Sequence, residues 1–133
     1  MFMSEQGHSS HTSESGAILI EMGATNNDAA VISPDGQHYK STSDVHAARV
    51  VGSSDVLAGV VAGLMAQKME ATTSALWGVH ILGLAVEAAS KDMGEEGIIA
   101  SDLIHRLPNV LRYVRRSPSL RKDTAPAGLR RTM

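Results

Sequence analysis

The chain has short apolar runs before residue 40 and longer helical patterns after residue 55. The apolar runs at 17–20 and 29–33 are typical of short buried strands. Pro34-Asp35-Gly36 is a strong turn sequence, so residues 37–40 are expected to return as an antiparallel strand. The first part of the chain is therefore predicted to contain short, paired strands.

Two helices are expected next. The first, at about 55–68, is apolar nearly all round, which predicts burial on several sides. Gly59 and Gly63 lie one turn apart on it and would leave a groove where another backbone can approach closely. The second helix, at about 72–92, has its apolar residues three and four positions apart, and Gly94 is a typical C-terminal stop.

A third helix is expected to begin at Ser101, which is a good N-cap residue. Its apolar positions continue to Val114, and Pro108 within it predicts a kink or a break. Only four residues of the chain are aromatic, so the core must be built from Ala, Val, Leu, Ile and Met. Short strands followed by about three packed helices, with such small side chains between them, favour an α/β fold.

Length and composition restrict the classes of protein further. The 133 residues suit one modest domain. The chain has no cysteine, which excludes disulfides, thiolate catalysis and Cys-ligated zinc. Its start lacks the basic and apolar regions of a secretory signal, and its longest apolar run, 56–66, is shorter than the roughly 20 residues of a membrane span. We therefore expect a cytoplasmic protein without a membrane partner.

The two ends of the chain differ from its middle. Residues 1–16 are polar and rich in serine, which predicts a flexible leader. His8 and His11 in this leader lack the further ligands that a metal site needs, so no metal ligands are assigned. Residues 115–133 hold six of the twelve basic residues and one acid, which predicts a basic flexible tail. No aromatic residue is interleaved with these charges, so no nucleic-acid partner is expected.

The clearest candidate for chemistry is the loop Gly52-Ser53-Ser54-Asp55, which runs into the first helix. Unpaired backbone N–H groups at a helix start can hold an anion, phosphate especially. An acid at this junction gains from the helix dipole and lies within reach of whatever the loop binds. An anion site with an adjacent base is what phosphoryl transfer to a hydroxyl requires. The alternative is structural: Ser53 or Ser54 caps the helix, and Asp55 is only a favourable first-turn acid.

Four sequence elements extend this observation along the chain. They are Gly-Ser-x-Asp-Val-Leu-Ala-Gly at 52–59, Gly-Leu-Met-Ala-Gln at 63–67, Leu-Trp-Gly-Val with Gly-Leu-Ala between 76 and 85, and Gly-Ile-Ile-Ala-Ser-Asp-Leu-Ile with Leu-Pro between 97 and 108. In this order they resemble the C-terminal part of the ADP/ATP-dependent NAD(P)H-hydrate dehydratases. The last element is closer to these enzymes than to other ribokinase-like proteins. The resemblance implies a partial ribokinase-like α/β domain over residues 17–114.

The resemblance also implies a reaction and a site. In this family water is removed from the damaged, hydrated nicotinamide ring of NADHX or NADPHX, a metabolite repair by a lyase that consumes a nucleotide. By position, Asp55 would contact the substrate hydroxyl as a base, and Gly52–Ser54 would cradle the transferring phosphate. Gly23 and Ala24 match a pair that lies beside the adenine nucleotide. The implied cofactor is ADP or ATP, with Mg²⁺ left open as a companion ion.

Several positions depart from the family's pattern. Ser54 stands where the anion loop has a second glycine, and its Cβ would crowd an approaching phosphate. Met22 stands where a lysine commonly precedes the Gly-Ala pair. The chain also matches only about the last two-fifths of a catalytic domain, which would leave apolar helix faces and a sheet edge uncovered. We therefore expect a homo-oligomer or a complementing chain.

Beside a truncated dehydratase, whose activity alone is left open, two alternatives remain. One is a catalytically silent module kept for oligomerisation or nucleotide binding, which Ser54 and Met22 favour. The other is a remnant of a ribokinase-like kinase for a small metabolite, which the element at 97–104 disfavours. His80 and Trp77 are interpreted as packed side chains and not as catalytic ones.

Overall fold

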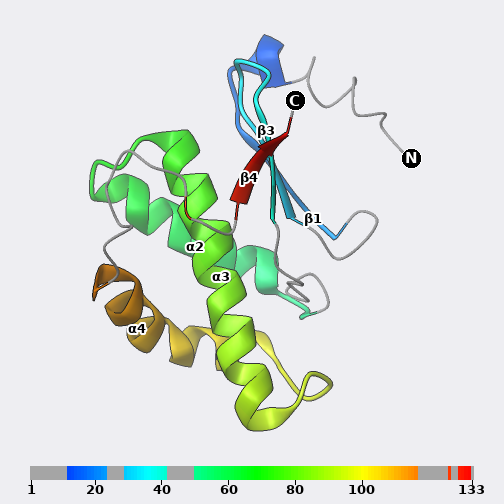
Figure 1. Ribbon diagram of the computed structural model, residues 1–133, viewed down its shortest axis with the longest axis vertical. Helices are drawn as coiled ribbons and strands as arrows, with labels where there is room; N and C mark the ends of the chain where they lie inside the picture. Colours follow the sequence, from blue (N-terminus) through cyan, green and yellow to red (C-terminus); the bar gives the residue numbers. More distant parts are fainter. Residues whose placement is uncertain (1–11, 24–28, 42–49, 117–125, 127–128, 133) are drawn as a thin grey trace.

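The computed structural model describes residues 12–23, 29–41, 50–116, 126 and 129–132. Its elements are β1 (Leu19–Met22), β2 (Ala29–Ile32), β3 (His38–Ser41), α2 (Ser53–Ala66), α3 (Ala71–Met93), α4 (Ala100–Arg116) and β4 (Leu129–Thr132). The sheet lies on one side of the helices and α4 on the other (Figure 1). This arrangement confirms the expected partial α/β fold of short strands followed by packed helices. Residues 12–15 form a helical turn with Thr12 buried, so the predicted flexible leader includes a folded segment.

The sheet is antiparallel throughout, in the order β1-β2-β3-β4. The predicted hairpin between β2 and β3 is confirmed, with Val31 opposite Tyr39. Its turn is held by Asp35, whose carboxylate accepts a hydrogen bond from the Ser33 hydroxyl and another from the Gln37 N–H at 3.2 Å. These bonds lower the pKa of Asp35, the Ser33 bond most strongly. Local turn chemistry thus sets the register of this hairpin.

β4 lies within the residues that composition predicted to be a flexible tail. It pairs with β3 and places Arg131 opposite Tyr39. Pro126, which precedes it, is buried. For these residues the prediction is wrong, because a count of charges does not register that the free edge of β3 offers a row of backbone partners.

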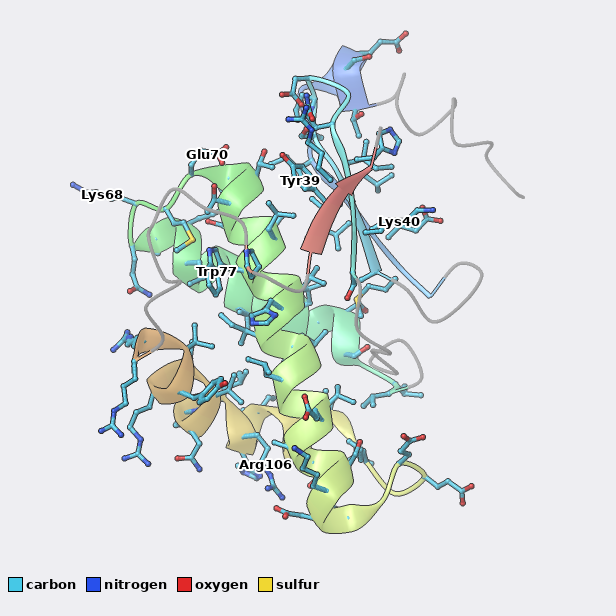
Figure 2. The ribbon with its side chains drawn as sticks, in the orientation of Figure 1. Tyr39, Lys40, Lys68, Glu70, Trp77 and Arg106 are labelled. Atoms are coloured by element: carbon cyan, nitrogen blue, oxygen red, sulfur yellow. The ribbon has the colours of Figure 1, made fainter. Side chains whose placement is uncertain are left out.

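α3 is the central helix of the fold. It contacts α2, α4, β2 and β3, and Trp77 and Leu82 are among its buried residues. The carboxylate of Glu70 caps its start by accepting hydrogen bonds from the N–H groups of Thr72 and Thr73, both at 2.9 Å (Figure 2). Gly94, at φ 75°, ends the helix as predicted. The expected helix at about 72–92 is therefore confirmed.

α4 begins one residue before its predicted cap. Ser101 is exposed inside the first turn and does not cap the helix. Instead the Asp102 carboxylate accepts a hydrogen bond from the Ile99 N–H at 3.0 Å, which is a capping contact from the third helical position. Pro108 does not break α4. An ion pair between Arg106 and Asp92 joins the helix to the end of α3.

α2 is less buried than its sequence predicts. Only Ser53, Val56 and Leu57 are buried, because α3 covers one side and α4 makes a looser contact. Gly59 and Gly63 are also not the point of close approach, since a Cβ on either would meet nothing within 4 Å.

The close approach between α2 and α3 occurs at Gly78. A Cβ on Gly78 would lie 2.5 Å from Cγ2 of Val61 and 3.3 Å from Cδ1 of Leu57. The glycine that permits close packing therefore lies on α3, and the side chains that fill the space belong to α2. Gly59 and Gly63 do line a groove, but within the described residues no backbone approaches them closely.

Candidate functional site

The turn into α2 depends on Gly52. Its φ of 84° and ψ of 2° place it in the left-handed region, directly before the first helical residue. A Cβ on Gly52 would lie 3.2 Å from the Cβ of Ala100 at the start of α4. Both the backbone conformation and the neighbour therefore favour glycine, and the first turns of α2 and α4 lie next to each other.

The backbone of this turn leaves an N–H group open. The Ser53 N–H donates to the Val50 carbonyl at 3.0 Å, and the Asp55 N–H donates to the Gly52 carbonyl at 3.1 Å. No side chain caps the helix. Within the described part of the chain the Ser54 N–H has no acceptor. An open N–H at the positive end of a helix dipole is an arrangement that binds anions.

The two serines do not act as helix caps. The N-cap residue is Gly52, and neither serine side chain bonds to the first turn. Ser53 is buried, whereas Ser54 and Asp55 are exposed. Lys68 is the only non-glycine residue with positive φ among those described, so Ser54 has no left-handed backbone strain. The capping alternative is therefore wrong for these serines, and the effect of Ser54 is limited to the bulk of its side chain in front of the turn.

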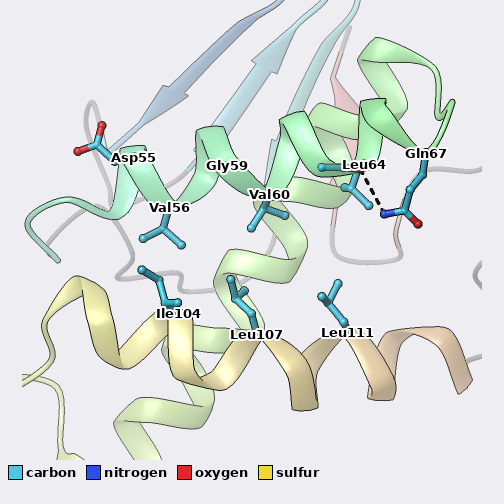
Figure 3. A pocket seen from close by; sticks show the side chains of 10 residues that line it. Asp55, Val56, Gly59, Val60, Leu64, Gln67, Ile104, Leu107 and Leu111 are labelled. Atoms are coloured by element: carbon cyan, nitrogen blue, oxygen red, sulfur yellow. Dashed lines mark hydrogen bonds between the residues drawn. The ribbon is translucent and has the colours of Figure 1, made fainter.

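Asp55 stands at the end of an open groove between α2 and α4 (Figure 3). The groove has a volume of about 390 Å³, and its large apolar side chains are Val56, Val60 and Leu64 from α2 and Ile104, Leu107 and Leu111 from α4. These side chains face one another across it, while the Asp55 carboxylate points away from α4 (Figure 3). Gln67, at the other end, donates a hydrogen bond to the Gly63 carbonyl at 3.2 Å. The groove is thus apolar along its length and polar at its ends.

The α4 side of this groove was missed by sequence reasoning. The face of α4 with Leu103 and Val110 is buried, and the adjacent face with Ile104 and Leu107 lines the groove. Both faces repeat at three- and four-residue spacing, so the pattern does not separate them. The available signal was an apolar arc on α4 wider than one neighbouring helix can cover.

A second hollow of about 260 Å³ continues from the far end of the groove. It shares Leu64, Gln67 and Leu111 with the groove and reaches Trp77 and Arg115. Trp77 is only 2% exposed and forms part of the core. The groove and this hollow together therefore have the carboxylate of Asp55 at one end and the guanidinium of Arg115 at the other.

His80 packs beside Trp77. The two ring centroids are 5.7 Å apart at an interplanar angle of 79°, an edge-on contact. Burial lowers the pKa of His80, which keeps the ring neutral near pH 7. These contacts support its interpretation as a packed side chain.

The Gly-Ala pair after β1 is only partly described. Gly23 follows the strand with φ 74°, so the chain turns sharply there. Ala24 lies outside the described residues. Met22, at the position where the resemblance predicts a lysine in most family members, is half-buried against the apolar core. The C-terminal end of β1 and the N-terminal end of α2 face the same side of the molecule in both views (Figures 1 and 3).

The turn at Gly52 has two features of a backbone anion site. They are an N–H group without an acceptor among the described residues and the positive end of a helix dipole. For metals, no group of three or more His, Asp or Glu side chains in the described ranges is placed to hold an ion. The arrangement can therefore hold an anion through the backbone, with the exposed Asp55 carboxylate available as a base beside it.

A family model and individual relatives both match this chain to the NAD(P)H-hydrate dehydratases. The family model described as NAD(P)H-hydrate dehydratase matches residues 9–109. A bifunctional NAD(P)H-hydrate repair enzyme of Moorella thermoacetica is 34% identical over 96 residues, which are 72% of this chain and 18% of that enzyme. An ADP-dependent (S)-NAD(P)H-hydrate dehydratase of Xanthomonas campestris is 34% identical over 95 residues, or 71% of this chain and 32% of the enzyme. Its counterpart in Haloterrigena turkmenica is 33% identical over 99 residues, or 74% and 37%. The chain thus spans less than two-fifths of the length of these relatives, and no solved structure matches it significantly.

Proposed function

Since this chain belongs to the NAD(P)H-hydrate dehydratase family, we propose that it carries the phosphate-binding turn and the base of a nucleotide-dependent dehydratase. The proposed reaction removes water from the hydrated nicotinamide ring of NADHX or NADPHX. ADP is the preferred nucleotide in this proposal, because two of the relatives are named ADP-dependent. The residues that complete the substrate pocket lie outside the matched segment, which spans only part of those relatives.

One observation carries this proposal: α2 starts at a left-handed glycine, has no side-chain cap and presents an open N–H beside an exposed carboxylate. When bound, the nucleotide supplies the phosphoryl group. The backbone of Gly52–Ser54 holds its oxygens, since the unpaired N–H is a donor aimed outward from the helix start. This positions the phosphate next to Asp55.

Asp55 serves as the base in this scheme. Its carboxylate would accept the proton of the ring hydroxyl while the hydroxyl oxygen forms a bond to the β-phosphorus of ADP and the bond from that phosphorus to the bridging oxygen breaks, which releases AMP. The phosphorylated oxygen would then leave as phosphate when the carbon–oxygen bond breaks, and loss of a proton from the neighbouring ring carbon to solvent would restore the ring double bond. Phosphate is a better leaving group than hydroxide, so the nucleotide is what makes the loss of water fast.

Location and assembly belong to the same proposal. None of the helices in the described ranges combines the length and the apolar character needed to cross a bilayer. We place the protein in the cytoplasm, where nicotinamide cofactors are used, and we expect it to act with a second copy or with a complementing chain.

Calorimetric titration of the purified chain with ADP and ATP tests the site. Ser54→Gly is expected to tighten ADP binding severalfold, because it removes the Cβ that stands in front of the turn. Ser101→Gly is the matched control, since Ser101 holds the equivalent exposed position in the first turn of α4. Equal affinities in the two variants would contradict the proposed phosphate site.

Turnover of NADHX and NADPHX separates a dehydratase from a silent module. Asp55→Asn is expected to abolish turnover and to leave ADP binding within a few-fold of the wild type, since the backbone holds the phosphate. Nucleotide binding without turnover by the wild-type chain would support a nucleotide-binding module that lost catalysis. A folded chain that binds neither ADP nor ATP would contradict both functions.

A further inference from the structure

One side of α2 is exposed along the whole helix. Its exposed residues are Ser54, Asp55, Ala58, Gly59, Ala62, Gly63, Met65 and Ala66, which we call the open face of α2. Met65 on this face is 48% exposed, and Ile104 across the adjoining groove is 52% exposed. Within the described residues, the open face and the groove beside it form a continuous apolar surface along α2 that no other element covers.

Charges stand only at the ends of this surface. Asp55 is the one charged residue of α2 and lies in its first turn. Lys68 follows the other end of the helix and points away from the molecule (Figure 2), and Arg115 lies at the far end of the adjoining hollow. The surface is therefore negative at the start of α2, apolar along its length and positive at its end.

We propose that the open face of α2 binds the same face of a second copy, with the two α2 helices antiparallel. An antiparallel pair brings the negative end of each surface to the positive end of the other, whereas a parallel pair would place like charges together. The helix dipoles also oppose each other in the antiparallel pair, which is favourable. The same residues lie on both sides of such an interface, as a two-fold dimer requires.

The two glycines on α2 set the register of this dimer. Glycine has no side chain to keep a second helix away. The two backbones therefore approach most closely where Gly59 of one copy faces Gly63 of the other. In this register Ala66, the last residue of one α2, lies level with Val56 of the other, and Lys68 follows two residues beyond the helix end, toward Ser54 of the other copy. The second copy thus supplies a cation to the turn at Gly52–Asp55. This role of Lys68 rests on the proposed function, and the dimer itself does not.

Light scattering during size-exclusion chromatography over a concentration series tests the dimer. The wild type is expected at twice the chain mass of 14.0 kDa. Gly63→Glu is expected to shift it to the monomer, because it buries a charge in the interface without clashing inside the helix. Asn109→Glu adds the same charge on an exposed position of α4 outside the groove and is expected to remain a dimer.

Three results overturn the dimer: a monomeric wild type at every concentration, a dimeric Gly63→Glu variant, or a monomeric Asn109→Glu variant. Circular dichroism checks that the Gly63→Glu variant is folded, and its helix content is expected to equal that of the wild type, since glutamate is the better helix former. If the chain is a monomer that binds a longer dehydratase chain, a complementing partner occupies the open face of α2, and the proposed dimer is overturned.

The direction of the pair has a separate test, because the chain has no cysteine of its own. Gly59→Cys and Gly63→Cys are prepared singly and oxidised with diamide alone and as a mixture. The antiparallel pair is expected to give several-fold more disulfide-linked dimer in the mixture than in either variant alone. If the single variants give as much disulfide-linked dimer as the mixture, or more, the pair is parallel and the proposed direction is contradicted.

Lys68→Ala tests the cation at the turn. It is expected to leave the mass unchanged and to weaken ADP binding several-fold. Lys91→Ala, on the exposed end of α3, is the matched control and is expected to change neither. A wild-type dimer that binds no ADP would leave the interface intact and contradict the proposed function, so the two failures are distinguishable.

Discussion

α2 and α3 are both apolar helices, yet α3 is buried along most of its length and α2 along one side only. α3 has neighbours on several sides, since α2, α4 and the sheet all contact it. α2 has α3 on one side and a groove on the next. The comparison teaches that an apolar sequence allows a helix to be buried, whereas the number of neighbouring elements determines what fraction of its surface is buried.

A matched pair of leucines tests this contrast most strongly. Leu82 of α3 is 1% exposed, whereas Leu64 of α2 is half-buried and lines the groove. Leu82→Ala is expected to lower the free energy of unfolding by about 2–5 kcal/mol, because it leaves a cavity in a packed core. Leu64→Ala is expected to lose less than half as much. Urea denaturation measures both, and equal losses would contradict the difference between the helices.

The glycines give the second test. Gly78→Ala is expected to destabilise the protein by about 1–3 kcal/mol, because its Cβ would overlap Val61. Gly59→Ala, measured in the monomeric Gly63→Glu variant so that the proposed α2 interface is absent, is expected to stabilise the chain by up to about 1 kcal/mol, since its Cβ enters open space and alanine is the better helix former. The two variants differ in sign, so thermal unfolding followed by circular dichroism distinguishes them. The same sign for both would show that α2 is covered where the groove lies.

The starts of the two helices give the third test. α3 has a carboxylate cap and α2 has none. Glu70→Ala is expected to reduce stability by about 1 kcal/mol, as loss of a helix cap does. Glu96→Ala, in the exposed loop after α3, is the control and is expected to change stability little. No difference between these two variants in urea would show that the cap has no effect on stability.

The pH dependence of that cap is the smallest expected effect. The Thr72 and Thr73 N–H groups lower the pKa of Glu70 in the folded chain. The unfolded chain therefore takes up the proton first, so the stabilisation is complete above the unfolded-state pKa and is lost as the pH falls through the folded one. Stability is expected to fall less steeply below pH 5 in Glu70→Gln than in the wild type. Parallel curves from urea titrations at several pH values would contradict this.

Local patterns predicted much of the fold. The hairpin at Pro34–Gly36 and the helix ending at Gly94 follow from turn and capping chemistry, which acts between neighbouring residues. β4 and the open face of α2 were missed because both depend on what lies nearby in space. Composition marked β4 as a tail, and periodicity marked α2 as buried, although neither property reports the neighbours that an element will have.

The candidate site shows the same division. The turn at Gly52 and the position of Asp55 were readable from the loop-to-helix sequence, and the structure adds the open N–H of Ser54. The groove beside Asp55 was not readable, since it is made by α4 residues about fifty positions later in the chain. Whether Gly23 reaches the same site depends on contacts between distant segments, which spacing alone does not encode.

The pairing of β4 with β3 has a consequence for how the chain acquires its structure during synthesis. β3 ends at Ser41 and meets its partner only at Leu129, so the whole helical part is translated before this edge of the sheet is closed. Contacts between such distant segments form slowly, because the intervening loop must close first. The hairpin of β2 and β3 therefore leaves the ribosome with the edge of β3 unpaired. Pairing of β4 then covers this edge and reduces aggregation between exposed strand edges.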